Sequence, residues 1–272
     1  MEIRETALSI YRTASDREIT LLAAGFAYYA FVSLIPLVLL ALVVGSLLGG
    51  EELAHRLIEF AGDLLPEAGE QLVTDALTTE AGRAEASIVA LVVATWGGLK
   101  VFRGLSKAFD EVYGGAGENS LLEELRDGLV VVVAVSGAVG LMIVVGIVLG
   151  IFAAEIPFVG VVSWAVLMLG LFFVFLPIYY VLPPVDVRLG EAIPGTVFAA
   201  IGWTVLQIGF QIYAANAAQY EAYGAVGAVL LFVTWLYFAG ILILTGVVIN
   251  VVLTRPEIAE GDPEPLEAIE RG

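Results

Sequence analysis

The sequence predicts an all-α protein, a polytopic membrane bundle with six transmembrane helices. Hydrophobic residues make up 60% of the 272 residues, and the mean hydropathy of +0.94 leaves too little polar surface to coat a soluble protein. Long apolar runs without alternation exclude strands, because backbone groups in lipid must be paired within helices or a closed barrel. Each apolar segment is near or above the ~20 residues that cross a bilayer. The segments are 21–48, 87–105, 128–153, 158–182, 192–214 and 225–253.

The basic residues predict the orientation of the chain. Threading the chain through the six segments places all of its 12 Lys and Arg residues on one side of the membrane, except Arg56 and Arg83. Loops rich in Lys and Arg remain in the cytoplasm. We therefore expect a multi-pass protein of the cell (cytoplasmic) membrane whose two termini are both cytoplasmic.

The segments between and beyond the spans predict three parts. Residues 1–15 place apolar side chains on one helical stripe, which is typical of a cytoplasmic amphipathic helix lying on the membrane surface. Residues 16–254 form the six-helix transmembrane domain. Its outer loop, 49–86, keeps helical apolar spacing on both sides of Pro66, which predicts two amphipathic helices. The acidic residues 255–272 are expected to form a disordered cytoplasmic tail.

Charge and residue usage argue against several function classes. The formal net charge is −17 and only Lys100 and Lys107 are lysines, a balance typical of an acidic, halophile-like protein. Such a surface opposes nucleic-acid binding, which needs clustered basic residues. Cysteine is absent, the single histidine rules out a His-ligated metal site, and no GxSxG motif is present. We expect no enzyme activity, no catalytic residue, no metal and no cofactor.

Glycines in the fifth span predict close helix packing. Gly195, Gly202 and Gly209 recur every seven residues and drift only slowly around one helical face. Without side chains, these positions form a groove into which a neighbouring helix can pack closely. We expect the fifth span to lie centrally in the bundle.

A second arc of the fifth span carries polar side chains, among them Thr204, Gln207 and Gln211. Amides that face lipid would leave their hydrogen-bonding groups unpaired, at a cost of several kcal/mol. The arc should therefore face protein or a watery cavity. Bonding between neighbouring helices is the simpler interpretation, and contact with a substrate is the alternative.

The first and sixth spans contribute further candidates for a substrate path. A proline in the middle of the first span removes a backbone hydrogen bond and should kink the helix. If the protein transports a substrate, we expect the path to lie between the first, fifth and sixth spans. Its candidate residues are Tyr28, Tyr29, Ser33, Pro36, Thr204, Gln207, Gln211 and Thr234.

Two charged clusters lie at the cytoplasmic ends of spans. Lys100, Arg103 and Lys107 share one helical stripe and could clamp an anionic lipid head group. The simpler interpretation is that they extend toward water and pair with acids three or four residues further on. Between the fourth and fifth spans, Arg188 lies near Asp186 and Glu191, which predicts a local ion pair.

The chain up to about Leu253 resembles the YihY/BrkB family of six-span membrane proteins, once labelled ribonuclease BN. Pro184 and Val248 depart from the family pattern, which usually has Asn and Glu there. The matching residues are Ala27-Tyr28-Tyr29, Ser33-Leu34-Ile35-Pro36, the stretch Ala108 to Tyr113, Leu182-Pro183, Val187-Arg188, Ile193-Pro194-Gly195, Tyr223-Gly224, Gly227-Ala228, Trp235-Leu236-Tyr237, Gly246 and Asn250.

The resemblance implies an integral cytoplasmic-membrane protein, described as a virulence or serum-resistance factor and linked to export or flipping of lipid-like substrates. The ribonuclease label has no support in the residues, since neither a basic surface nor a metal cluster is present. Our leading hypothesis is a transporter or flippase of a lipid-like or amphipathic substrate. The alternative is a non-transporting membrane scaffold or envelope assembly factor. Membrane lipids are the expected partners, a homo-oligomer is compatible with the sequence, and the substrate is unknown.

The predicted orientation can be tested by cysteine labelling, because the chain contains no native cysteine. A membrane-impermeant thiol reagent added to intact cells should label Thr79→Cys, which lies in the outer loop. It should not label Asn119→Cys, because basic flanking residues hold that linker in the cytoplasm. The opposite labelling pattern would contradict the orientation.

Overall fold

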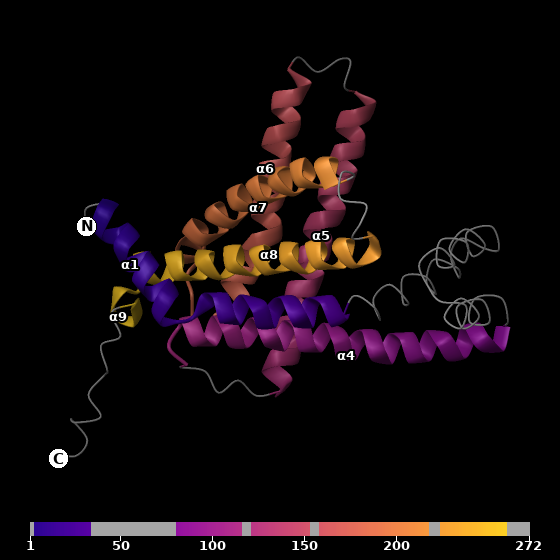
Figure 1. The fold of residues 1–272 in the computed structure, drawn as a ribbon, viewed down its shortest axis with the longest axis horizontal. Helices are drawn as coiled ribbons and strands as arrows, with labels where there is room; N and C mark the ends of the chain where they lie inside the picture. The colour runs from indigo at the N-terminus through magenta and orange to yellow at the C-terminus, as the bar shows by residue number, and fades with distance from the viewer. Residues whose placement is uncertain (1–2, 34–79, 116–120, 153–157, 218–223, 260–272) are drawn as a thin grey trace. The chain divides into compact units, whose positions relative to one another are not determined.

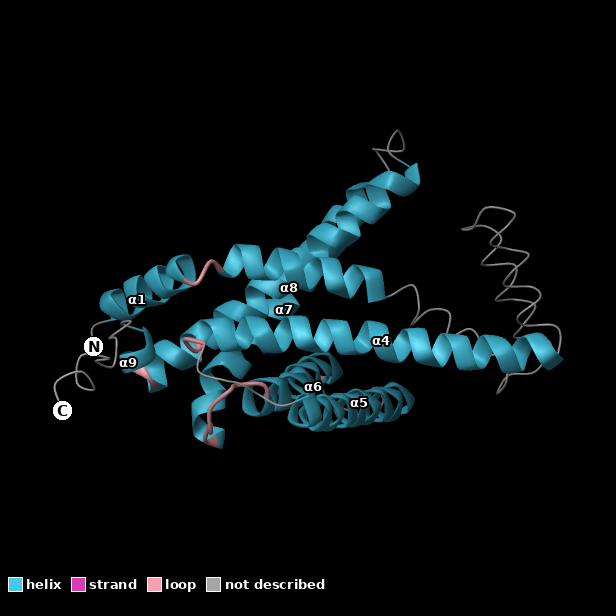
Figure 2. Cartoon of the chain, turned by 90° about the horizontal axis from the view of Figure 1, so that it is seen from below, coloured by secondary structure: helices cyan, strands magenta, loops and turns pink. Residues whose placement is uncertain are grey.

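The computed structural model describes residues 3–33, 80–115, 121–152, 158–217 and 224–259. All regular elements in these ranges are helices (Figures 1 and 2), which confirms the all-α prediction. The helices are α1 (Ile3–Asp16), the unlabelled helix Ile19–Ser33, α4 (Glu80–Val112), α5 (Leu121–Ile151), α6 (Val159–Val181), α7 (Leu189–Ala217), α8 (Gly224–Thr254) and α9 (Pro256–Ala259).

Four of the helices are long and apolar enough to cross a membrane, and Ile19–Ser33 is a shorter apolar helix. This result confirms a polytopic helical membrane protein. The outer part of the first span with Pro36 and residues 49–79 of the outer loop lie outside the described residues. Residues 80–86, which were predicted to belong to that loop, form the beginning of α4. The four spanning stretches are Arg126–Ile151, Val159–Val181, Leu189–Tyr213 and Val229–Thr254.

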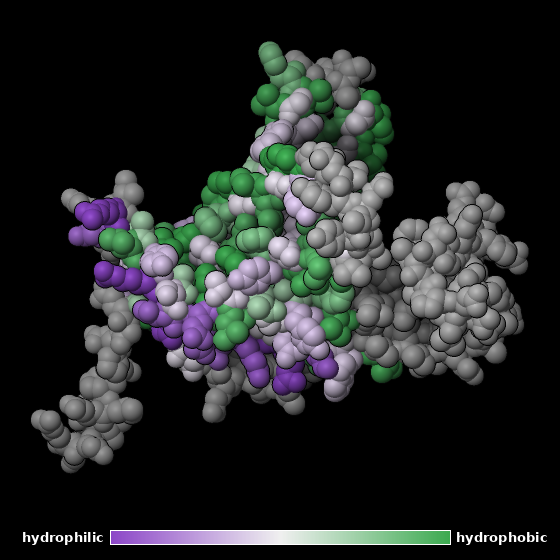
Figure 3. Space-filling model, viewed as in Figure 1, coloured by the Kyte–Doolittle hydropathy of each residue, from purple (hydrophilic) through white to green (hydrophobic). Residues whose placement is uncertain are grey.

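The chain divides into two compact units. One unit comprises Tyr28–Phe102, and the other comprises Met1–Ala27 together with Arg103–Gly272. Within the larger unit, α5 to α8 pack in chain order, each helix against the next, while α1 and α9 lie against α8 (Figure 1). In the face shown in Figure 3, apolar residues cover much of the surface of the described helices, and hydrophilic residues lie around α1 and along the lower edge of the view.

The helices α7 and α8 approach each other closely at two glycines, Gly195 and Gly246. Oδ1 of Asn250 accepts a hydrogen bond from the backbone N–H of Gly195 at 2.6 Å, and Nδ2 donates to the carbonyl of Ala192 at 3.4 Å. A Cβ atom on Gly195 would overlap the carbonyl oxygen of Gly246 and would lie 2.8 Å from Oδ1 of Asn250. The two backbones can therefore approach this closely only because neither glycine has a side chain.

A tyrosine of α6 completes this contact. The hydroxyl of Tyr179 donates a hydrogen bond to the carbonyl of Ile243 at 2.8 Å, and its side chain is 1% exposed. A buried phenol needs such a partner, because its polar group would otherwise be unpaired. The ring passes so close to Gly246 that a Cβ atom there would overlap the hydroxyl. On the α4 side, the rings of Phe109 and Tyr179 have centroids 6.0 Å apart.

The glycine face of α7 is covered by α8 at Gly195 and at Gly202, but not at Gly209. A Cβ atom on Gly202 would lie 2.5 Å from Cδ1 of Leu242, at the end of a flexible side chain of α8. A Cβ atom on Gly209 would have no neighbour within 4 Å. The predicted groove therefore does not continue to Gly209, although the next residue, Phe210, packs against Trp235 of α8 with ring centroids 6.0 Å apart.

The N-terminal helix ends at a sharp corner. Glu18 has a φ of 46°, in the left-handed region that non-glycine residues seldom occupy, and its N–H bonds to the Ser15 carbonyl at 3.1 Å. The next helix then begins at Ile19. The α1 face that is buried carries Thr13, which is 3% exposed, whereas Tyr11 is 73% exposed. A corner between two separate helices is consistent with the break predicted near residue 15.

The glycine contacts predict a graded response to alanine. Gly195→Ala should reduce the melting temperature in detergent strongly, because the new methyl group meets a backbone carbonyl that cannot move away; overpacking typically costs about 1–3 kcal/mol. Gly202→Ala should cost less, since Leu242 can change rotamer. Gly209→Ala is the matched control in the same helix and should leave the melting temperature unchanged or raise it. Equal effects at all three positions would contradict the closeness of the α7–α8 contact.

Adjacent tyrosines of α6 offer a second test. Tyr179→Phe removes a buried hydrogen bond and should lower stability by roughly 0.6–1.7 kcal/mol, the range of interhelical hydrogen bonds in membrane proteins. Tyr180→Phe is the control, because Tyr180 is 48% exposed and should tolerate the change. Thermal unfolding of the two variants in the same detergent gives the comparison. A larger loss of thermal stability in Tyr180→Phe than in Tyr179→Phe would contradict the assignment of the buried hydrogen bond to Tyr179.

Candidate functional site

The polar arc of α7 divides into a buried part and an exposed part. Thr204 is 5% exposed, and its hydroxyl donates to the Ala200 carbonyl at 3.1 Å. The neighbouring Trp203 packs edge-on against Phe175 of α6 and Trp235 of α8, with ring centroids 5.5 Å and 5.2 Å away. This part of the arc packs against other helices, which differs from the substrate-facing role considered for Thr204.

Gln207 and Gln211 form the exposed part of the arc. They lie one helical turn apart on α7, within the spanning stretch Leu189–Tyr213, and both are exposed. Within the described residues, neither side-chain amide has a hydrogen-bond partner from another helix. The structure therefore exposes both glutamines, whereas Thr204, one helical turn before Gln207, is buried.

The remaining path candidates are distributed over both units. Tyr28 and Tyr29 are 63% and 40% exposed, and their rings meet edge-on with centroids 5.6 Å apart. Ser33 is buried and donates to the Ala30 carbonyl at 2.8 Å. Thr234 of α8 is exposed and donates to the carbonyl four residues earlier at 2.7 Å. Both of these hydroxyls thus bond to their own helices. Pro36 lies outside the described residues.

The predicted basic stripe is present as one face of α4. Lys100 and Lys107 are exposed, and Arg103 is half-buried. Nζ of Lys100 lies 5.7 Å from the ring centroid of Trp96, a distance at which a cation is attracted to the aromatic face. This pairing was not predicted. The head-group site at this stripe stays a prediction.

The charged cluster between α6 and α7 has a different partner from the one predicted. Glu191 pairs with Arg255 at the end of α8, with Oε2 and Nη2 3.3 Å apart, and not with Arg188 through its side chain. Arg188 contributes its backbone N–H, which bonds to the same carboxylate at 3.3 Å. Arg255 also donates to the carbonyl of Asp186. The ion pair therefore joins two helices instead of stabilising one loop.

Tyr113, just after α4, lies within the electrostatic reach of this cluster. Burial raises the pKa of its hydroxyl to about 12, while the charge of Arg255 lowers the pKa and that of Glu191 raises it. The phenol is therefore neutral at physiological pH. The same end of the unit holds α9, where Nη2 of Arg17 donates to the Ile258 carbonyl at 3.4 Å.

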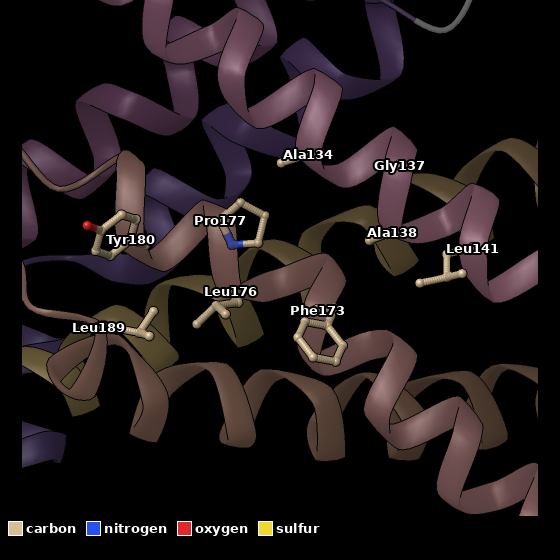
Figure 4. A pocket seen from close by; sticks show the side chains of 9 residues that line it. All are labelled: Ala134, Gly137, Ala138, Leu141, Phe173, Leu176, Pro177, Tyr180 and Leu189. Carbon is tan, nitrogen blue, oxygen red and sulfur yellow. The ribbon is translucent and has the colours of Figure 1, made fainter.

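A cleft of about 370 Å³ lies between α5 and α6 (Figure 4). Tyr180 and Leu189 lie at one end, and Leu141 and Phe173 lie at the other. The end with Leu189 is close in sequence to the Glu191–Arg255 pair, so this end of the cleft faces the end of the unit that carries α9. The lining is almost wholly apolar and consists of Ala134, Gly137, Ala138, Leu141, Phe173, Leu176, Pro177, Tyr180 and Leu189.

Sequence reasoning missed the residues that hold the helices together. Tyr179, Arg255 and the Lys100–Trp96 pair were not singled out, and Asn250 was noted only as part of a resemblance. A tyrosine in the middle of an apolar span is a usable signal, because its hydroxyl must find a partner. Within the described residues, no group of three or more His, Asp or Glu side chains could hold a metal ion.

Comparison with known proteins gives a consistent assignment. Residues 10–269 match the family described as virulence factor BrkB. The chain is 27% identical to a ribonuclease-like protein of Bacillus subtilis, YfkH, over 89% of this chain and 92% of that protein. It is 28% identical to a UPF0761 membrane protein of Azoarcus sp. over 85% of this chain and 59% of that protein.

A Psychrobacter UPF0761 membrane protein is 39% identical over 35% of this chain, although the match covers only 17% of that protein. No solved structure matches the chain. The match to the family extends from within α1 to beyond α9, so it includes all four spanning stretches and the Gly195–Asn250 contact. The chain is therefore a multi-pass membrane protein that belongs to the virulence factor BrkB family.

Proposed function

We propose that the protein is a transporter or flippase that moves a lipid-like or amphipathic substrate across the membrane. The observation that carries the proposal is the pair of exposed amides, Gln207 and Gln211, on a spanning helix. Their spacing of four residues places both amides on one side of α7. Such a pair can bind the polar part of a substrate while its apolar part remains in hydrocarbon.

In a membrane, hydrocarbon surrounds the exposed side chains of the spanning stretch of α7. Each amide carries two donors and one acceptor, and hydrocarbon offers no partner for them. Leaving them unpaired costs several kcal/mol. Gln207 and Gln211 therefore need a polar partner, and a substrate head group passing along α7 supplies one.

A scaffold is the second candidate function. In that case the same amides bond to another part of this chain, to a second copy or to another membrane protein. The spanning stretch of α5 offers such a partner an apolar surface, because most of its side chains are exposed. The two functions differ in whether substrate moves.

The similar protein of Bacillus subtilis has a ribonuclease-like name, and we do not propose that activity for this chain. RNA binding requires clustered positive charge, and the formal net charge of the chain is −17. We infer instead that the protein has no catalytic activity. Purified protein incubated with RNA should leave the RNA intact, and cleavage that depends on one side chain would contradict this inference.

The function can be tested in vesicles of phosphatidylethanolamine and phosphatidylglycerol that contain a head-group-labelled phospholipid. The parent protein should speed the exchange of label between leaflets, and Gln207→Leu with Gln211→Leu should abolish that exchange. The melting temperature of this double variant should differ little from that of the parent, because interhelical hydrogen bonds in membranes average only ~0.6 kcal/mol.

Ile208→Leu with Ile212→Leu is the matched control, since this pair has the same spacing on α7 and both side chains are exposed. The control should retain the exchange rate of the parent. A parent protein that moves no lipid would favour the scaffold. A double glutamine variant that loses stability but keeps its exchange rate per folded molecule would show that the amides only join helices.

A further inference from the structure

We propose that the cleft between α5 and α6 binds an acyl chain of a membrane phospholipid, with the lipid head group beside Tyr180. The site is separate from the glutamine pair. Its lining comes from α5, α6 and the first residue of α7, Leu189, and includes neither Gln207 nor Gln211. This inference does not depend on transport, because a bound lipid can also be a permanent part of the protein.

The position of the cleft determines what can fill it. Both α5 and α6 contain stretches long and apolar enough to cross the membrane. Most side chains of Arg126–Ile151 in α5 are exposed, so this helix presents most of its surface to the hydrocarbon. A cleft that opens on such a surface is in contact with lipid chains and not with water.

Small residues of α5 create the cleft. Ala134, Gly137 and Ala138 line one wall, opposite Phe173 and Pro177 of α6 (Figure 4). A Cβ atom on Gly137 would have no neighbour within 4 Å, so helix–helix contact does not explain this glycine. An unfilled apolar space would forfeit dispersion contacts along both walls, and water cannot replace them because polar partners are lacking.

The dimensions of the cleft favour a lipid chain. Its volume of about 370 Å³ lies in the range of small-molecule pockets, about 300–1,000 Å³. A helix with its side chains is ~10–12 Å across and cannot enter a space of this size. No charged side chain lines the cleft, so the head group must lie outside it.

Tyr180 gives the cleft a polar end. It lies one residue before the end of α6 at Val181, and its side chain is 48% exposed. Tyrosines at the ends of spans typically place the ring in hydrocarbon and the hydroxyl at the head-group level. The hydroxyl can donate a hydrogen bond to an ester or phosphate oxygen of the lipid whose chain occupies the cleft.

The test uses the full chain in vesicles of phosphatidylethanolamine and phosphatidylglycerol containing a trace of phospholipid with a photoactivatable group in its acyl chain. After illumination, mass spectrometry identifies the labelled peptides. The parent protein should be labelled preferentially on the two cleft walls, near Ala138 and Phe173. Labelling spread evenly around α5 would indicate ordinary boundary lipid and would overturn the proposal.

Two glycines of the same helix provide a matched pair of variants. Gly137→Leu places a side chain in the cleft and should reduce labelling of Phe173 by about tenfold, because each excluded methylene weakens apolar binding roughly fourfold. Gly140→Leu is the control, since Gly140 is also exposed and open but does not line the cleft. Labelling of Phe173 in this control should equal that of the parent.

Melting temperatures measured in parallel show that both variants fold, and the open space around each glycine predicts that they do. Equal labelling in Gly137→Leu and Gly140→Leu would overturn the proposal. Disulfide-linked dimers formed through Ala138→Cys in this cysteine-free chain, together with absent lipid labelling in the parent, would show that a second copy covers the cleft, which also overturns it.

Discussion

The close approach of α7 and α8 at Gly195 and Gly246 is the contact on which the larger unit depends. Within a membrane, helices gain little hydrophobic energy from meeting one another, so backbone proximity and interhelical hydrogen bonds must hold them. Asn250 supplies both a donor and an acceptor across this contact. Tyr179 adds a third helix to it through the Ile243 carbonyl. The exposed surfaces of α5 and of the far part of α7 are possible because this contact secures the bundle elsewhere.

Sequence patterns predicted the elements but not their partners. Apolar length and glycine spacing depend on each helix alone, so the spans and the role of Gly195 could be predicted. Which residue opposes Gly195 depends on how two helices are rotated and shifted, and no local pattern encodes that. The same limit explains why Glu191 was assigned to Arg188, its neighbour in sequence, when its partner is Arg255, 64 residues later.

The polar arc shows a second limit of sequence reasoning. Periodicity placed Thr204 and Gln207 on one side of α7, and that geometry holds. It could not show that the arc passes from a packed region beside Trp203 and Trp235 to an exposed one. Residues on the same arc of α7 therefore meet different surroundings. Threonine can satisfy its hydroxyl within its own helix, whereas glutamine needs a partner elsewhere.

The side-chain bonds from α1 to α9 have a consequence for biosynthesis. The hydroxyl of Thr13 reaches the Ala259 carbonyl at 3.5 Å, across 246 positions of the chain. Because the ribosome delivers the chain from its N-terminus, α1 emerges first and its partner emerges after the last span. The first helix therefore lacks these bonds until the residues of α9 have been synthesised.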